Sequence, residues 1–317
     1  MPELPDVTIY VEALASRIVG STVRRVRVLR PFVLRTFEPA IDAIEGCSAV
    51  GVTRLGKRIV IEFGPVADGA NELPLFLVMH LMIAGRLRWQ DIPPAKPAKI
   101  VLAQFDFDGG TLLLTEAGSK KRASMHLVRG RDALARHDPG GIEPLEADRA
   151  AFAETLHREN RTLKRALTDP RLFSGIGNAY SDEILQAAGL SPVMLTSRVT
   201  DEQIDRLHIA TRDRLNHWLD VLRREFADRF PGPGQITAFR PDFAVHGKFG
   251  QPCPTCGAAV QRIRYAENEV NYCPGCQTNG KILADRSLSR LLKDDWPRSI
   301  DQLEAQFDSR KPGDGGE

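Results

Sequence analysis

Long hydrophobic runs and a disulfide framework are both missing from this sequence. The longest apolar run, residues 73–85 of 317, is interrupted by Pro74 and His80, whereas a membrane-spanning helix needs roughly 20 apolar residues. Only five cysteines are present, and an odd number does not form a complete set of disulfides. These absences exclude a disulfide-rich secreted module and predict a protein with no transmembrane helix and no membrane partner.

A signal peptide and a strong charge excess are missing as well. Glu3 and Asp6 stand where a signal peptide carries basic and then apolar residues, so we expect a cytoplasmic protein. The net charge is +2, and it is +5 for residues 1–300, because residues 301–317 hold five acids and two bases. Such a small excess permits a polyanionic partner without requiring one. With 42% hydrophobic residues, the chain can form two or three domains with real cores.

Four of the cysteines form two C-x2-C pairs, Cys253 with Cys256 and Cys273 with Cys276. Both pairs contain the proline and glycine that tight turns favour, and the 16 residues between them suit a β-hairpin. Zinc takes four ligands tetrahedrally, and four thiolates leave no open position on the metal. The pattern therefore predicts one structural zinc ion; a redox or unmetallated thiol set is the alternative. Cys47 stands alone in an apolar stretch and is expected to be a buried small hydrophobe.

Residues 22–115 alternate short apolar stretches with turn residues, which predicts a β-sandwich. A short amphipathic helix is expected before it, at residues 7–18. After a Gly/Pro-rich linker at residues 138–144 the pattern becomes helical. The expected strands are residues 22–29, 58–63, 75–79, 86–89, 101–107 and 111–114, and the expected helices are residues 149–158, 162–168, 179–188 and 201–226.

The pattern thus predicts a multidomain α+β protein. We expect a β-sandwich domain over residues 1–137, a helical domain over 145–232, a zinc finger over 243–280 and a C-terminal extension over 281–317. The second boundary rests on the FPGPG stretch at residues 230–234. In the extension, residues 283–292 are expected to be helical, and the residues from Ser309 onward disordered.

The stretch Phe173–Leu185 places a Gly-Ile-Gly-Asn turn before a helical pattern. Backbone N–H groups at a helix N-terminus, together with the Asn178 amide, are suited to bind a phosphate. Lys164, upstream in the stretch RTLKRAL, could add a positive charge to the same phosphate. The alternatives are an ordinary helix cap for the turn and a solvated surface lysine for Lys164.

Pro2 follows the initiator methionine, and removal of Met1 would leave a free secondary amine, although most proteins with proline at this position make no use of it. Five marks occur in order: PELPD at the start, LGKR with Lys57, HLMIAG from His80, GIGNAY from Gly175, and the four-cysteine finger. Together, over roughly residues 2–278, they resemble the formamidopyrimidine-DNA glycosylase / endonuclease VIII family.

The resemblance implies a catalytic β-sandwich domain that carries Pro2 and Glu3. Pro2 would attack C1′ of a damaged nucleotide, expel the base and form a Schiff base, while Glu3 would protonate the sugar. Lys57 would act beside them at the phosphates that flank the lesion, together with His80. Elimination on both sides of the opened sugar would then nick the strand.

The resemblance also implies a DNA partner and a helix–two-turn–helix domain. On that domain Lys164 and Asn178 would hold the DNA backbone, and the finger would lay its hairpin along the DNA. The enzyme would be a bifunctional DNA glycosylase and abasic-site lyase of base excision repair, acting as a monomer.

The chemistry of Pro2 agrees with this role without the resemblance. A terminal α-amine has a pKa of about 7.7–8.0, so about a tenth of it is neutral and nucleophilic at pH 7. A secondary amine gives a cationic iminium, which acidifies the neighbouring C2′ hydrogen. Glu3 supplies the acid and base steps. Because C1′ is shielded in a duplex, the nucleotide must be flipped out, which requires phosphate contacts on both sides.

The wedge that fills the gap left by the flipped base departs from the family pattern. Family members usually place methionine where this chain has Ile83, which is still an apolar wedge. The arginine and phenylalanine that usually complete the wedge are expected near residues 116–125, where no phenylalanine occurs. Met125, or Lys121 with Arg122, are the replacements available there.

In the finger, the usual phosphate-binding arginine is replaced by Asn268, and Arg262 or Arg264 is available to compensate. Residues 234–252 are shorter than in members that cover 8-oxoguanine with a loop, and look more like the endonuclease VIII branch. We therefore expect oxidised pyrimidines or formamidopyrimidines as substrates. Two rivals remain: a protein on the same scaffold that binds damaged or single-stranded DNA without cutting it, and a zinc-ribbon RNA-binding or transcription factor.

Overall fold

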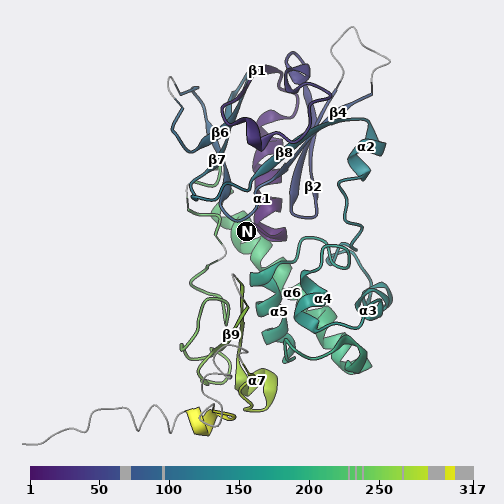
Figure 1. The fold of residues 1–317 in the computed structure, drawn as a ribbon, viewed down its shortest axis with the longest axis vertical. Helices are drawn as coiled ribbons and strands as arrows, with labels where there is room; N and C mark the ends of the chain where they lie inside the picture. Colours follow the sequence, from purple (N-terminus) through teal and green to yellow (C-terminus); the bar gives the residue numbers. More distant parts are fainter. Residues whose placement is uncertain are drawn as a thin grey trace, which may run out of the picture. The chain divides into compact units, whose positions relative to one another are not determined.

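The structure is a computed structural model, and it divides into two compact units that are described separately (Figure 1). Unit 1 comprises Met1–Glu143, Phe173–Gly175 and Leu215–Ala238, and unit 2 comprises Pro144–Leu172, Ile176–Arg214 and Phe239–Glu317. The residues described are 1–64, 73–94, 97–227, 229–232, 234–237, 239–265, 268–284 and 297–303.

Unit 1 contains two antiparallel four-stranded sheets, in the orders β1-β6-β7-β5 and β2-β3-β4-β8. One hydrophobic cluster contains residues from both sheets, so they form the predicted β-sandwich. The strands are β1 Val23–Val28, β2 Ala49–Leu55, β3 Arg58–Phe63, β4 Leu75–His80, β5 Gly85–Gln90, β6 Val101–Phe107, β7 Gly110–Glu116 and β8 Ser124–Arg129.

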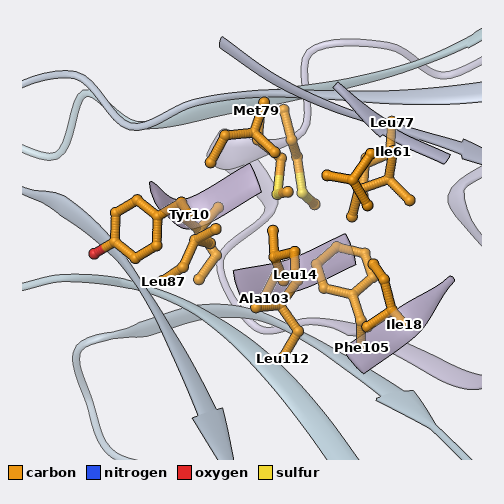
Figure 2. Packing of buried hydrophobic residues seen from close by; sticks show 14 of the residues in the cluster. Tyr10, Leu14, Ile18, Ile61, Leu77, Met79, Leu87, Ala103, Phe105 and Leu112 are labelled. Atoms are coloured by element: carbon orange, nitrogen blue, oxygen red, sulfur yellow. The ribbon is translucent and has the colours of Figure 1, made fainter. Parts of the chain in front are cut away.

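Helix α1, Leu4–Ile18, contributes one face to the core of unit 1. Tyr10, Leu14 and Ile18 follow each other at spacings of four, so they lie on one side of the helix, and all three are fully buried. Figure 2 shows these side chains packed with residues of both sheets. Truncating such a residue, for example Leu14→Ala, costs about 2–5 kcal/mol of stability.

The six predicted strands are confirmed, with ends shifted by at most two residues. Strands β2 and β8 were missed. Gly51 and Thr53 dilute the apolar pattern in β2, and Ser124 and His126 do so in β8. The N-terminal helix begins three residues earlier than expected, because Pro5 suits the first turn of a helix. Cys47 is buried in the core, as predicted.

Unit 2 holds the four predicted helices and the predicted hairpin, apart from the last part of α6, from Leu215 onward, which belongs to unit 1. The expected helix at residues 283–292 and the tail from Ser309 lie almost wholly outside the described residues. The elements are α3 Arg149–His157, α4 Leu163–Thr168, α5 Asn178–Ala188, α6 Asp201–Glu225, β9 Gln261–Tyr265, β10 Asn268–Tyr272 and α7 Pro274–Thr278.

Shorter elements complete the described chain. They are the helix α2 Arg131–Ala135 and three single turns of 3-10 helix, Pro31–Val33, Ile41–Ile44 and Thr196–Arg198. Within the described ranges, every helix is too short or too polar to cross a bilayer.

Candidate functional site

The residues at the start of unit 1 are held in place by backbone hydrogen bonds. The Leu4 N–H donates to the Gly175 carbonyl at 2.9 Å, and the Glu3 N–H donates to the Asp6 carboxylate at 3.0 Å. Gly175 has φ +79°, and a Cβ there would lie 2.8 Å from the Leu4 Cβ, so only glycine fits. Pro2 and Glu3 are buried directly before α1. The two residues that follow Pro2 are therefore fixed to the fold.

Burial favours a neutral amine at the chain start, whereas the surrounding charges act in both directions. Burial lowers the pKa of the Met1 amine, Glu3 and Asp6 oppose this shift, and Arg86 and Lys57 add to it. Arg86 was not among the predicted site residues. It gave no signal because the RLRW stretch that contains it reads as an ordinary strand, and only the fold brings it near the chain start.

Lys57 and His80 lie at neighbouring strand ends. Lys57 is in the turn between β2 and β3, where Gly56 has φ +61°, and His80 pairs with Arg58 across β3 and β4. Burial, with the charges of Arg58 and Lys57 and the nearby His126, lowers the pKa of His80 to about 4. His80 is therefore a neutral imidazole near pH 7, which can donate a hydrogen bond to a phosphate without adding a positive charge.

A tight turn between β4 and β5 presents Ile83 to solvent. Met82 has φ +53°, the Gly85 N–H donates to the Leu81 carbonyl at 2.9 Å, and Ile83 is 56% exposed. The Arg86 guanidinium donates to the Ile83 carbonyl at 3.0 Å. The turn is thus fixed from within while its apolar side chain stays accessible, which is the property a wedge requires.

The loop after β7 is fixed by the buried carboxylate of Glu116. This carboxylate accepts the N–H groups of Arg122 and Ala123 at 2.9–3.3 Å, and the Lys121 ammonium donates to the Glu116 carbonyl. Met125 is completely buried in the core. The suggestion that Met125 fills the gap is therefore wrong, because the side chain faces the sandwich interior. Lys121 and Arg122 remain the available replacements.

Arg54 connects the turn of Lys57 with the segment that holds the chain start. Its guanidinium donates to the Gly56 carbonyl at 2.8 Å and to the Ser174 hydroxyl at 3.2 Å, and it forms an ion pair with Glu143. Ser174 and Glu143 lie far from Arg54 in the sequence, so no local pattern could have revealed these two contacts. The contacts stabilise the surroundings of Pro2 and Lys57 as one structure.

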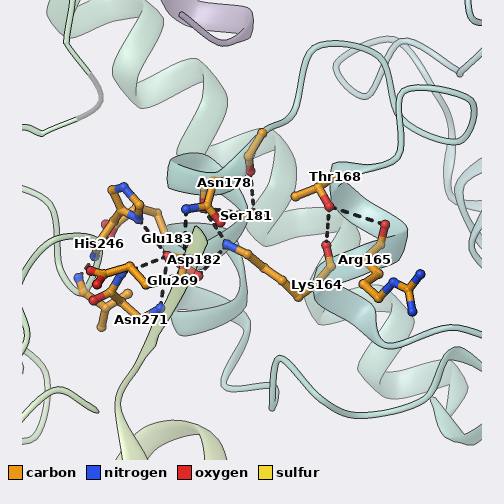
Figure 3. A network of polar contacts seen from close by, with 12 residues as sticks. Lys164, Arg165, Thr168, Asn178, Ser181, Asp182, Glu183, His246, Glu269 and Asn271 are labelled. Atoms are coloured by element: carbon orange, nitrogen blue, oxygen red, sulfur yellow. Dashed lines mark hydrogen bonds and ion pairs between the residues drawn. The ribbon is translucent and has the colours of Figure 1, made fainter. Parts of the chain in front are cut away.

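In unit 2, the Gly-Ile-Gly-Asn turn leads into α5, whose first residue is Asn178. The Asn178 amide donates to the Glu269 carbonyl on β10 at 3.0 Å. Lys164 on α4 is buried, with 8% of its side chain exposed, and its ammonium donates to the Asn178 carbonyl and to the Asp182 carboxylate, each at 2.5 Å (Figure 3). Lys164 is therefore not the solvated lysine of the alternative interpretation, and Asp182 is a partner that the sequence analysis missed.

The finger hairpin holds the residue that departs from the family pattern. Asn268 begins β10 and pairs with Tyr265, and its side chain is outside what the structure describes. The Arg262 guanidinium lies 4.2 Å from the Phe249 ring centroid and 3.6 Å from the Glu269 carboxylate. Arg262 is thus occupied within the finger. The side chain of Arg264 is exposed.

The four cysteine sulfurs of the finger lie within 4.8 Å of one another. This spacing fits zinc, because Zn–S bonds of about 2.3 Å place tetrahedral thiolates about 3.8 Å apart. A Cβ on Gly275 would lie 2.9 Å from the Cys256 sulfur, so glycine is required beside the metal site. The Gln186 amide of α5 donates to Thr255 at 3.0 Å and attaches the finger to the helix. The cysteines form one structural zinc site.

Unit 1 thus contains Pro2, Glu3, Lys57, His80 and Ile83, whereas unit 2 contains Lys164, Asn178, Asn268 and the four cysteines. Three family models match the chain one after another, in the order of the predicted domains. The formamidopyrimidine-DNA glycosylase N-terminal domain matches residues 1–121, the H2TH domain of that enzyme matches residues 141–223, and the zinc finger found in FPG and IleRS matches residues 250–279. Fold and site together define a zinc-finger DNA glycosylase.

Relatives and solved structures agree with this class. The chain is 31% identical over 295 residues to a formamidopyrimidine-DNA glycosylase of Mycolicibacterium vanbaalenii, an alignment that covers 89% of this chain and all of that protein. Two Lactococcus lactis Fpg complexes, one with DNA containing Fapy-dG and one with DNA containing an oxidised pyrimidine, each superpose with a TM-score of 0.75 at 26% identity over 87% of this chain and 100% of theirs. The chain belongs to the formamidopyrimidine-DNA glycosylase family.

Proposed function

We propose that the protein is a bifunctional DNA glycosylase and abasic-site lyase that removes oxidised pyrimidines and formamidopyrimidines and then nicks the strand by β,δ-elimination. The observation that carries this proposal is the chain start: Pro2 is buried directly before Glu3 and Leu4, whose N–H groups are held by hydrogen bonds, and burial lowers the pKa of the amine at this end of the chain.

Removal of Met1 would turn the Pro2 nitrogen into a free secondary amine at the N-terminus of α1. The helix dipole carries a partial positive charge at that end, which disfavours protonation of the amine. Burial, the main cause of the lowered pKa of the Met1 amine, acts in the same direction, as do the charges of Arg86 and Lys57, whereas Glu3 and Asp6 oppose them. A larger neutral fraction at pH 7 makes Pro2 a better nucleophile.

The proposed reaction begins as the Pro2 nitrogen bonds to C1′ and the bond from C1′ to the damaged base breaks. The base leaves with the electron pair and takes up a proton. Glu3 protonates O4′ as the sugar ring opens, which leaves a cationic iminium between Pro2 and C1′. Loss of the C2′ proton expels the 3′ phosphate, and loss of the C4′ proton then expels the 5′ phosphate.

The phosphates beside the lesion are assigned to residues of both units. Lys57 provides a charge and the neutral His80 a hydrogen bond from unit 1. From unit 2, Asn178 and the finger strand from Asn268 onward contact the backbone, and Lys164 supports the Asn178 turn through its hydrogen bond to the Asn178 carbonyl. Ile83 fills the space of the flipped nucleotide. We further propose that the protein is cytoplasmic. We also propose that it acts as a monomer, because one chain supplies every group that the reaction needs.

The substrate proposal follows from the residues and from the relatives. The L. lactis neighbours were solved with a ring-opened purine and with an oxidised pyrimidine in their DNA. In this chain the wedge consists of Ile83 without a phenylalanine in residues 116–125. Oligonucleotides that carry single lesions will rank the two base classes.

Borohydride trapping tests the mechanism. One version of the protein keeps an N-terminal peptide that locks the Pro2 nitrogen in an amide, and the matched control carries the same peptide at its C-terminus. Mass spectrometry first verifies that Met1 is absent from the control. We expect a covalent adduct with abasic-site DNA only in the control, since an amide nitrogen cannot form an iminium.

An equal adduct in both versions would refute the role of Pro2. The absence of any adduct, with DNA binding intact, would favour the second candidate, a protein that binds damaged or single-stranded DNA without cutting it. The replaced arginine at Asn268 and the missing phenylalanine favour that candidate.

A further inference from the structure

Asp182 is a completely buried carboxylate on which three separate segments of unit 2 converge (Figure 3). One oxygen accepts the Lys164 ammonium of α4 at 2.5 Å. The other oxygen lies 2.7 Å from Nδ1 of His246 and accepts the Asn271 N–H of β10 at 3.2 Å. An unpaired buried carboxylate is costly, so this degree of pairing is what allows a charge at that position.

The neighbouring acid, Glu183, fixes the segment that carries His246. Its carboxylate accepts the N–H groups of Ala244, Val245 and His246 at 2.7–2.9 Å. Asp182 and Glu183 thus attach α5 to the segment that precedes the finger. None of these contacts is made by a cysteine, so the network is a feature separate from the zinc site.

Strand β10 joins this network to the phosphate-binding turn. Its Glu269 carbonyl accepts the Asn178 amide at 3.0 Å, and two residues later Asn271 donates to Asp182. The Lys164 ammonium bridges the same two points, because it donates to the Asn178 carbonyl and to Asp182. The start of α5, α4 and the finger strand are therefore connected through one carboxylate.

We propose that Asp182 is a positioning residue that neutralises the charge of Lys164 and holds the Asn178 turn in place. Unit 2 then binds a DNA phosphate through the correctly placed N–H groups of this turn rather than through an additional positive charge. This inference rests on the proposed function, because it concerns the same DNA backbone contact. A lysine that acts as a charged phosphate ligand would instead contribute a released counterion, which steepens the salt dependence of binding.

The salt dependence of DNA binding separates these roles. Anisotropy titrations with a labelled duplex containing a stable abasic-site analogue are made from 50 to 200 mM salt on the full chain, Asp182→Asn and the double variant Lys164→Met with Asp182→Asn. The double variant replaces the ion pair with neutral groups of similar shape and leaves the net charge unchanged.

We expect the double variant to bind about tenfold more weakly at fixed salt, as loss of a charged hydrogen bond predicts, with an unchanged slope of log K against log salt. Asp182→Asn alone should steepen the slope by up to about 0.9, because the Lys164 charge is then released. The proposal would be overturned if the slope of the double variant became shallower by about 0.9, or if the slope of Asp182→Asn were unchanged.

Asp205→Asn is the matched control, because it makes the same substitution in a surface ion pair with Arg149 and should leave affinity and slope unaltered. Zinc content and circular dichroism verify that each variant is folded. If the double variant does not fold, the slope of Asp182→Asn still decides the question. Borohydride trapping of the unaltered protein is a separate readout, so failure of the proposed function is distinguishable from failure of this inference.

Discussion

The two units use charged side chains in opposite ways. At the chain start of unit 1, burial lowers the pKa of the Met1 amine, the carboxylates Glu3 and Asp6 oppose this shift, and Arg86 and Lys57 add to it. In unit 2, the cation Lys164 is buried against Asp182 and serves to connect helices and strand. The difference indicates that unit 1 is organised to change the reactivity of one atom, whereas unit 2 is organised to hold a shape.

Removal of the metal should produce the largest effect, and this effect should at first be limited to unit 2, which contains the four cysteines. Cys256→Ser removes one of four ligands, and structural zinc contributes about 10–16 kcal/mol to small zinc domains. We expect loss of bound zinc and of DNA binding, measured by metal analysis and anisotropy. Cys47→Ala, in the core of unit 1, should retain zinc; if it also loses the metal, the cysteine assignment is wrong.

Glu3→Gln should abolish chemistry while it leaves binding intact. Loss of a positioned acid lowers rates by about 10²–10⁴-fold, which single-turnover cleavage of abasic-site DNA measures. Glu12→Gln is the control, because Glu12 lies on α1, the helix that Glu3 precedes, and pairs with Arg223 at the surface. A rate close to that of the unaltered protein in Glu3→Gln would remove Glu3 from the mechanism.

Gly175→Ala tests whether the chain start depends on its fixed anchor. The added Cβ meets Leu4 at 2.8 Å at a residue with positive φ, so we expect a loss of about 1–3 kcal/mol in urea unfolding together with slower cleavage. Gly140→Ala shares the positive φ but has nothing within 4 Å of the new Cβ. Equal effects of the two substitutions on cleavage would show that backbone strain, and not the Leu4 contact, is responsible.

The smallest expected effect is a pH dependence of stability that comes from His80. Its pKa of about 4 lies below the ordinary 6.5, because burial and nearby cations disfavour its charged form. The unfolded chain therefore binds more protons between pH 6.5 and 4, and stability falls as the pH drops through that window. The contribution stays below about 3 kcal/mol, since the ring is partly solvated.

His80→Gln should flatten this part of the stability curve, measured by urea unfolding at several pH values. His126 and His137 have pKa values lowered in the same direction, mainly by burial, so some slope should persist. His157→Gln, at an exposed position of α3, should leave the curve unaltered. A curve that is unchanged in His80→Gln would refute the neutral imidazole.

The predictable features of this protein are those written in short stretches of sequence. Alternation of apolar residues predicted β3 and β6 to the residue, and two C-x2-C pairs predicted the zinc ligands. Arg86 and Asp182 could not be found in this way, because their roles arise from contacts that only the fold creates. Lys164 could be predicted only in part. The sequence suggested that it acts together with Asn178, but it did not reveal that Lys164 is buried against Asp182.

The Gly-Ile-Gly-Asn stretch has a consequence for how the protein can evolve. Its first glycine accepts the hydrogen bond that anchors the chain start, and its asparagine begins α5, only three residues later. Three peptide steps reach at most about 11 Å between Cα atoms. The covalent connection therefore sets an upper limit on the distance between Gly175 and Asn178 in every conformation of the chain. An insertion within these four residues should be among the least tolerated anywhere in the protein.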